Sequence, residues 1–188
     1  MPNLQMSYNI YDNILPQVLV NTGQDIDHSF ITHTTNGYVG PSGDVTNSYI
    51  YRGDDNPHTF SAWYTGTNEF AYNIIEAQYT AGHTDDGDHL MGFLAGTNVN
   101  AHHNILIDKY SGVLFNSVAG APAGTNHFYN NTVYSNGTVY GQLIRNEAGT
   151  VWAGTLNVDS NLVVDTNPAS VSRGVNFPTA TADQIDYT

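Results

Sequence analysis

The fold is decided by residues 98–136, where NVNAHHNILIDKYSG is followed directly by VLFNSVAGAPAGTNHFYNNTVYSN. This stretch shows one pattern twice: a strand-like run ends at an asparagine, an aliphatic pair follows, and a polar tip leads to a second apolar run. The anchors are Asn104 and Asn131, and the same template fits at Asn73, at Asn161 and, less closely, at Asn13. The four clear anchors are 31, 27 and 30 residues apart (73 to 104, 104 to 131, 131 to 161). A strand-built repeat of this length indicates a solenoid.

Two apolar columns accompany the anchors. The residues three positions before the anchors are Phe70, Ala101, Phe128 and Val158. The residues two positions after them are Ile75, Leu106, Val133 and Val163. This alternation is typical of strands, so both columns are expected to point inward, with Leu106 and Val133 as buried neighbours in adjacent coils. The residues two positions before the anchors are expected to face outward: Ala71, His102, Tyr129 and Asp159.

The anchors require a physical reason to be asparagine. A residue at a sharp bend between two strands often takes a left-handed conformation, which asparagine tolerates better than most residues. A side-chain amide stacked on its equivalent one coil away can also donate and accept a hydrogen bond at once. The sequence therefore predicts a structural ladder made of Asn73, Asn104, Asn131 and Asn161.

The runs AHHNILID, NHFYNNTVYS and NVDSNLVVD resemble the coils of right-handed parallel β-helix proteins. That group includes pectate-lyase-like enzymes, other polysaccharide lyases and hydrolases, and bacteriophage tailspikes. The resemblance covers residues 68–166 and, less closely, 8–67. It implies an all-β fold, a single-stranded right-handed parallel β-helix of about five or six coils, and function is not fixed by this architecture.

Residues 1–188 are expected to form a single β-helix domain, with residues 54–67 as a projecting loop and residues 167–188 as a C-terminal tail. In the second coil both Asn36 and Asn47 could be the anchor. Asn36 is preferred, because VTNSYIYRG then matches the later apolar runs LMGFLAG and VLFNSVAG.

The composition of the chain argues against several classes of partner and of chemistry. The chain has 4 Lys+Arg against 17 Asp+Glu, a formal net charge of −13. Such a surface repels phosphate backbones, so no nucleic-acid partner is expected, and it repels polyanionic glycans unless a metal intervenes. The absence of cysteine excludes thiol catalysis and cysteine-ligated metals. No apolar run is long enough to span a membrane, and the start MPNLQMSYNIYDN does not resemble a signal peptide.

The densest polar cluster is HTDDGDH, residues 83–89. Its carboxylates, Asp85, Asp86 and Asp88, could hold Ca²⁺, which prefers oxygen ligands, and the flanking histidines could instead favour a transition metal. A solvated turn and a catalytic site are the alternatives. No other cofactor is expected.

If the chain is an enzyme, its candidate catalytic residues are Asp85, Asp88, Asp108 and Lys109. Asp85 or Asp88 with Asp108, at the matching turn of the next coil, could form the carboxylate pair of a hydrolase. Lys109 is the one plausible lyase base, and a salt-bridged turn lysine is the alternative. The NTD, GHG and RIK signatures that a polygalacturonase-type hydrolase would carry are absent, and so is a cluster of arginines.

Four aromatic residues precede the third coil and could bind glycan or form a subunit interface: Tyr49, Tyr51, Trp63 and Tyr64. Packing of the 54–67 loop against the solenoid is the alternative.

The sequence favours a non-enzymatic structural or attachment module, such as a capsid decoration protein or spike subunit, at a virion surface or in the extracellular space. The chain is short, lacks catalytic signatures and shows no strong cap at either end, which favours self-assembly as a trimer or docking on a larger particle. The alternative is a carbohydrate-active enzyme, a polysaccharide hydrolase or lyase, or a glycan-binding module.

Overall fold

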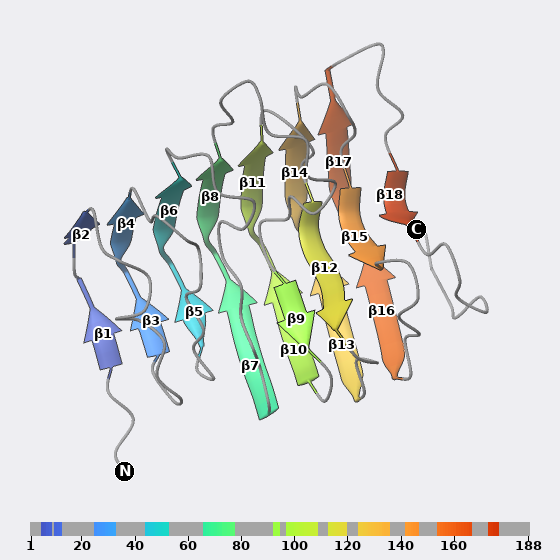
Figure 1. Ribbon diagram of the computed structural model, residues 1–188, viewed down its shortest axis with the longest axis horizontal. Helices are drawn as coiled ribbons and strands as arrows, with labels where there is room; N and C mark the ends of the chain where they lie inside the picture. Colours follow the sequence, from blue (N-terminus) through green and yellow to red (C-terminus); the bar gives the residue numbers. More distant parts are fainter. Residues whose placement is uncertain are drawn as a thin grey trace.

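The computed structural model describes residues 5–8, 10–12, 25–32, 44–52, 66–77, 92–94, 97–108, 113–119, 124–135, 142–146, 154–166 and 173–176. All regular structure within these ranges is β, and every pairing between strands is parallel. The strands form three sheets (Figure 1). This architecture is compatible with a parallel β-helix.

The first sheet has seven strands in the order β1-β3-β5-β7-β10-β13-β16. Their bounds are β1 (Gln5–Ser7), β3 (Asp25–Asp27), β5 (Val45–Thr46), β7 (Gly66–Ala71), β10 (Thr97–His102), β13 (Thr125–Tyr129) and β16 (Thr155–Asp159).

The second sheet also has seven strands, in the order β17-β14-β11-β8-β6-β4-β2. Their bounds are β2 (Ile10–Asp12), β4 (Phe30–Thr32), β6 (Tyr49–Arg52), β8 (Ile74–Ala77), β11 (Ile105–Asp108), β14 (Thr132–Ser135) and β17 (Leu162–Asp165). Each first-sheet strand is followed after two residues by a second-sheet strand, so the two sheets share one line of bends (Figure 1).

The third sheet has four strands in the order β18-β15-β12-β9. Their bounds are β9 (Gly92–Leu94), β12 (Val113–Ala119), β15 (Gln142–Asn146) and β18 (Arg173–Asn176). Because β18 pairs with β15, the expected tail over 167–188 contains a strand of this sheet.

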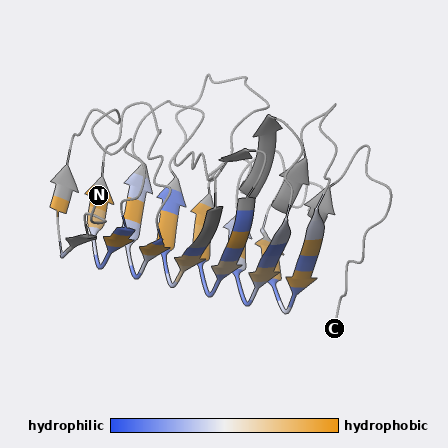
Figure 2. Ribbon diagram, turned by 90° about the horizontal axis from the view of Figure 1, so that it is seen from below, coloured by the Kyte–Doolittle hydropathy of each residue, from blue (hydrophilic) through white to orange (hydrophobic). Residues whose placement is uncertain are grey.

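Stacked apolar columns build the core, because successive residues of a strand point to opposite faces. In the first sheet Phe70, Ala101, Phe128 and Val158 are paired in register and buried. In the second sheet Ile75, Leu106 and Val133 are paired in register and fully buried, with Val163 half-buried at the end. The predicted contact between Leu106 and Val133 is thereby confirmed. Figure 2 shows the alternation of hydrophobic and hydrophilic residues along the strands and the hydrophilic bends between the two sheets.

The preferred register of the second coil is wrong. Val45 pairs with Phe70, and Ile50 pairs with Ile75. The run VTNSYIYRG therefore lies in the first and second sheets, and it does not match the runs that form β9 and β12. The reason is that Ser48 takes the anchor position, which leaves Val45 and Ile50 in the two buried columns. Asn36 lies outside the described residues, as does Asn13, which follows β2 and the first bend at Tyr8.

The expected outward row lies on the outer face of the first sheet, because its residues alternate with the buried column, but two of its four positions are shielded from solvent. Asp159 is exposed and Tyr129 half-buried, but Ala71 is fully buried and His102 is 5% exposed. The methyl group of Ala71 lies between the longer side chains of Thr46 and His102 on the paired strands, which shield it. The His102 ring is covered by aromatic rings of neighbouring coils, described below.

Candidate functional site

The bends between the first and second sheets carry most of the described polar side-chain contacts. One residue of each bend is left-handed, and these residues form an outer corner row: Tyr8, His28, Asn47, Tyr72, His103, Asn130 and Ser160, with φ of 46–59°. The anchoring asparagines follow them directly. The expectation that the anchors themselves are left-handed is thus wrong, because the preceding residue makes the turn and the anchor then points inward.

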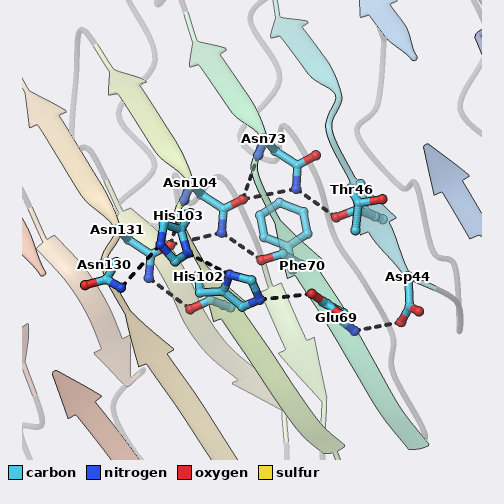
Figure 3. A network of polar contacts seen from close by, with 12 residues as sticks. Asp44, Thr46, Glu69, Phe70, Asn73, His102, His103, Asn104, Asn130 and Asn131 are labelled. Carbon is cyan, nitrogen blue, oxygen red and sulfur yellow. Dashed lines mark hydrogen bonds and ion pairs between the residues drawn. The ribbon is translucent and has the colours of Figure 1, made fainter. Parts of the chain in front are cut away.

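The anchors form a continuous ladder on the inner side of the bends (Figure 3). The Nδ2 of Asn73 donates to Asn104 Oδ1 at 3.0 Å, Asn104 donates to Asn131 at 2.9 Å, and Asn131 donates to Asn161 at 2.9 Å. Each Oδ1 also accepts the backbone N–H of the anchor one coil before it. Each Nδ2 in addition reaches a backbone carbonyl, as Asn104 does to Phe70 at 2.8 Å.

Serine continues the ladder toward the N-terminus. The backbone N–H of Ser48 donates to Asn73 Oδ1 at 3.0 Å, and that of Ser29 donates to Ser48 Oγ at 3.1 Å. Both serines are buried. The sequence template missed them because it required asparagine, although Ile26 and Ile31 flank Ser29 in the same apolar columns. A template with either asparagine or serine at the anchor would have found them.

A second network lies just outside the ladder, at the end of β10 (Figure 3). His102 Nε2 lies 2.9 Å from Glu69 Oε1 on β7, and His102 Nδ1 lies 2.9 Å from His103 Nδ1. His103 Nε2 lies 3.3 Å from Asn130 Nδ2. Four residues from three successive coils are thus joined in one chain of polar contacts.

Asn130 fixes the direction of these hydrogen bonds. An amide nitrogen only donates, so His103 Nε2 accepts and the proton of that ring is on Nδ1. His103 Nδ1–H then donates to His102 Nδ1, which leaves the His102 proton on Nε2, where it donates to Glu69. With both rings neutral, the contacts therefore define one consistent pair of tautomers.

Aromatic stacking encloses the two histidines. The His102 ring stacks on Tyr129 at 4.7 Å between centroids, and the His103 ring stacks on Tyr72 at 5.0 Å. Tyr72 also meets His102 edge-on at 5.3 Å. The rings stack face to face between neighbouring strands, so these contacts connect one strand-bend-strand unit to the next.

Carboxylates on the outer face of the first sheet also connect coils. Asp25 Oδ1 accepts the backbone N–H of Asp44 at 3.0 Å, and Asp44 Oδ1 accepts that of Glu69 at 2.7 Å. Burial raises the pKa of Asp44, and the charges of Asp25 and Glu69 raise it further against the hydrogen bond from Glu69 N–H.

Asp27 shows the opposite balance. Burial acts to raise its pKa, but hydrogen bonds from Asn47, His28 and Thr46 together outweigh burial and lower it. Asn47 Nδ2 and Thr46 Oγ1 donate to Asp27 Oδ1 at 2.9 and 2.8 Å. Asp27 is therefore held as a carboxylate.

The predicted aromatic site divides between described and undescribed residues. Tyr49 and Tyr51 are half-buried on β6, and the hydroxyl of Tyr49 donates to Glu76 Oε2 at 2.8 Å. Burial, this hydrogen bond and the charge of Glu76 raise the pKa of Tyr49 to about 12. Trp63 and Tyr64 lie outside the described residues.

Most of the predicted metal and catalytic residues cannot be placed, so these sites stay predictions. Asp85, Asp86, Asp88 and Lys109 lie outside the described residues. Asp108 is the last residue of β11, in register with Ala77 and Ser135. Among the described side chains, no group of three or more His, Asp or Glu is arranged to hold a metal ion.

The described part of the chain likewise contains no helix of a length and hydrophobicity that could cross a membrane.

No protein-family model, no curated protein and no solved structure matches this chain. Any conclusion about function therefore depends on the residues described above.

Proposed function

We propose that this chain is a non-enzymatic structural or attachment module built on a right-handed parallel β-helix. Seven strands in each of two sheets support about seven coils, rather than the five or six expected from length. A virion surface or the extracellular space is the proposed place of action, in a self-assembly such as a trimer or docked on a larger particle.

The observation that carries this proposal is how the polar groups of the bends are used. The Glu69–His102–His103–Asn130 chain, the two ring stacks and the carboxylate-to-backbone bonds all join one coil to the next. A general acid or base must instead present its group to a substrate at hydrogen-bond distance. Side chains that are already hydrogen-bonded between coils support a structural role better than a catalytic one.

An assay for turnover tests this proposal. The full chain is incubated with a panel of neutral and acidic polysaccharides, with and without Ca²⁺, and new reducing ends and unsaturated uronate products are measured. A hydrolase and a lyase of known activity serve as positive controls. We expect no product above the blank; product formation that Glu69→Gln or Asp108→Asn abolishes would overturn the proposal in favour of the carbohydrate-active enzyme.

One surface favours a second candidate, a glycan-binding module. The outer face of β13 and β16 presents four exposed, uncharged polar side chains: Thr125, His127, Thr155 and Asn157. Asn157 Nδ2 lies 3.2 Å from His127 Nδ1, so the two are held side by side. Amide, imidazole and hydroxyl groups suit the hydroxyls of a neutral sugar, whereas the net charge of −13 disfavours a polyanionic one.

Calorimetric titration with neutral oligosaccharides tests the second candidate. Binding that the double substitution His127→Ala and Asn157→Ala removes would support it, while the matched pair His28→Ala and Asn47→Ala, at distant bends, should leave the affinity unchanged. If no heat of binding is measured at millimolar oligosaccharide, the glycan-binding candidate is excluded.

A further inference from the structure

The outer face of the second sheet carries a row of large apolar side chains that is interrupted at one position, Thr132. The first residue of each strand is in register with the first residue of the next, from one end of the sheet to the other. We call these positions the apolar row: Ile10, Phe30, Tyr49, Ile74, Ile105, Thr132 and Leu162. Six of the seven are large and apolar or aromatic, and the strands lie side by side in Figure 1.

Much of this row is open to solvent. Ile10 is 78% exposed, Leu162 56%, Phe30 45%, Ile105 42% and Ile74 38%. Single exposed apolar residues are ordinary on protein surfaces, but a contiguous file of them marks an interaction site. A parallel file widens the row at its C-terminal end, where Ile107, Tyr134 and Val164 are in register and Tyr134 is 37% exposed.

Two neighbouring members of the row are held in place by contacts within the sheet. The rings of Phe30 and Tyr49 stack at 5.0 Å with an angle of 8° between their planes. The hydroxyl of Tyr49 is held by Glu76 at 2.8 Å, so the tyrosine is fixed on the sheet. Side chains that are already ordered lose little conformational entropy when a partner covers them.

We propose that the apolar row is the surface along which a second copy of this chain binds. This inference deepens the proposed structural function, on which it rests, by naming the partner. Two observations select a copy of the same chain: the charge pattern and the area.

The charge pattern fits contact between identical surfaces. None of the seven row positions is charged, although the chain carries 17 Asp+Glu, and the outer face of the first sheet carries Asp25, Asp27, Asp44, Glu69 and Asp159. In a symmetric contact a carboxylate near the axis would face its own copy, which is destabilising. A surface that binds a basic partner would instead carry acidic groups, and the apolar row has none.

The area is close to what two copies need. Seven strands spaced by about 4.8 Å, and two outward rows of residues, give a strip of roughly 34 by 13 Å, or about 450 Å² projected per copy. The second row has carboxylates at two of its seven positions, Asp12 on the end strand and Glu76, whose Oε2 accepts the Tyr49 hydroxyl. Two copies together then bury about 900 Å² from the strip alone, just below the roughly 1,000 Å² that a stable specific interface should exceed.

The first experiment measures the mass of the full chain in solution. Analytical ultracentrifugation is done at 1–100 µM chain and at about 0.05 and 0.5 M NaCl. The measured mass is compared with the single-chain mass of 20.5 kDa. We expect a mass of at least two chains, with tighter association at high salt, because salt screens the repulsion between two copies of charge −13. A single-chain mass at 100 µM in both salts would overturn the inference.

Matched variants locate the contact. Ile74→Asp with Ile105→Asp places charge in the apolar row, and Thr155→Asp places the same charge at an exposed position of the first sheet. The double variant should be monomeric and Thr155→Asp should associate like the parent, both with the parent circular dichroism spectrum. Unchanged association of the double variant would contradict the proposal.

Cross-linking gives a test that does not depend on charged variants folding. The chain has no cysteine, so Ile74→Cys introduces a single thiol at the middle of the row. Facing sheets lie about 10 Å apart, which a short bis-maleimide spans. Ile74→Cys should give a covalent dimer at low micromolar concentration and Thr155→Cys should not; equal yields would overturn the inference. The outcome is separate from the polysaccharide assay, since turnover would overturn the proposed function without altering the mass.

Discussion

At the scale of single residues, the side chains that matter most are the ones that join one coil to the next. Asn104 is the best example, because its amide makes four hydrogen bonds: it accepts from the backbone N–H and Nδ2 of Asn73, and it donates to Phe70 O and Asn131 Oδ1. Asn104 is 1% exposed, so water cannot replace these bonds.

Asn104→Ala should therefore destabilise the chain strongly. At least two buried polar groups lose their partners, at about 1–3 kcal/mol each, so we expect the free energy of unfolding to fall by about 2–6 kcal/mol. Urea denaturation followed by circular dichroism measures the change. Asn161→Ala is the matched control: Asn161 accepts the same two bonds from Asn131 but is half-buried at the end of the ladder, where water can enter. Equal losses at the two positions would contradict a buried ladder.

Asp44 and Asp27 should give opposite pH dependences. The pKa of Asp44 is raised by burial and by nearby carboxylates, so its ionisation costs stability as pH rises past its ordinary value of 3.8. Asp44→Asn keeps an oxygen to accept the Glu69 N–H and removes the charge. It should raise the melting temperature at pH 7, with no advantage below pH 3.8.

The pKa of Asp27 is lowered, because the three hydrogen bonds outweigh burial, so its carboxylate stabilises the fold above its unfolded pKa of 3.8. Asp27→Asn should lower the melting temperature at pH 7, and this loss should fade as pH falls through the folded pKa. Calorimetric scans from pH 2.5 to 7 compare both variants with the parent. A shift of the same sign for both would show that the balance of burial and hydrogen bonding has been misjudged.

At the scale of elements, the two-residue bend is the repeating unit, a left-handed residue followed by an inward anchor. The sequence made the strands and the two apolar columns predictable after Asn68, because their alternation and spacing are regular. It did not reveal the register before Asn68, because serine replaces asparagine at Ser29 and Ser48. Nor did it reveal which residue of the bend is left-handed, since tyrosine, which takes that position at Tyr8 and Tyr72, has no special preference for the conformation.

One part of the candidate site, the asparagine ladder, could be predicted because asparagine recurs at a regular spacing in the sequence. The contacts of His102 with Glu69, 33 residues away, could not be predicted, because they depend on how coils of unequal length stack. The apolar row could not be predicted either, because three of its members, Ile10, Phe30 and Tyr49, precede residue 68, where the sequence could not be aligned.

The left-handed bend residue gives an element-scale prediction at Ser160, which is exposed with φ of 51°. Glycine removes the cost of about 1 kcal/mol that a side chain has in this conformation, so Ser160→Gly should raise the free energy of unfolding by up to that amount. Ser160→Val should lower it, because a β-branched residue resists positive φ. In the strand control, Thr155→Gly should be destabilising. Destabilisation by Ser160→Gly would contradict the left-handed bend.

At the scale of the whole molecule, the ladder, the ring stacks and the buried columns run from coil to coil, so the chain is organised as one continuous stack. In a chain of charge −13, the outer face of the second sheet also presents the apolar row, whose seven positions carry no charge. These two properties are what a structural or attachment module requires, and they support the proposed self-contact.

The most direct test of this account is the exchange of side-chain carboxamide protons with D₂O, followed by NMR at neutral pH. If the ladder is continuous, the Nδ2 protons of Asn73, Asn104 and Asn131 are buried and hydrogen-bonded, and all three should exchange far more slowly than those of the exposed Asn130 and Asn157. Fast exchange at any one of the three ladder residues, at the rate of Asn157, would contradict the stack of coils on which the proposed function rests.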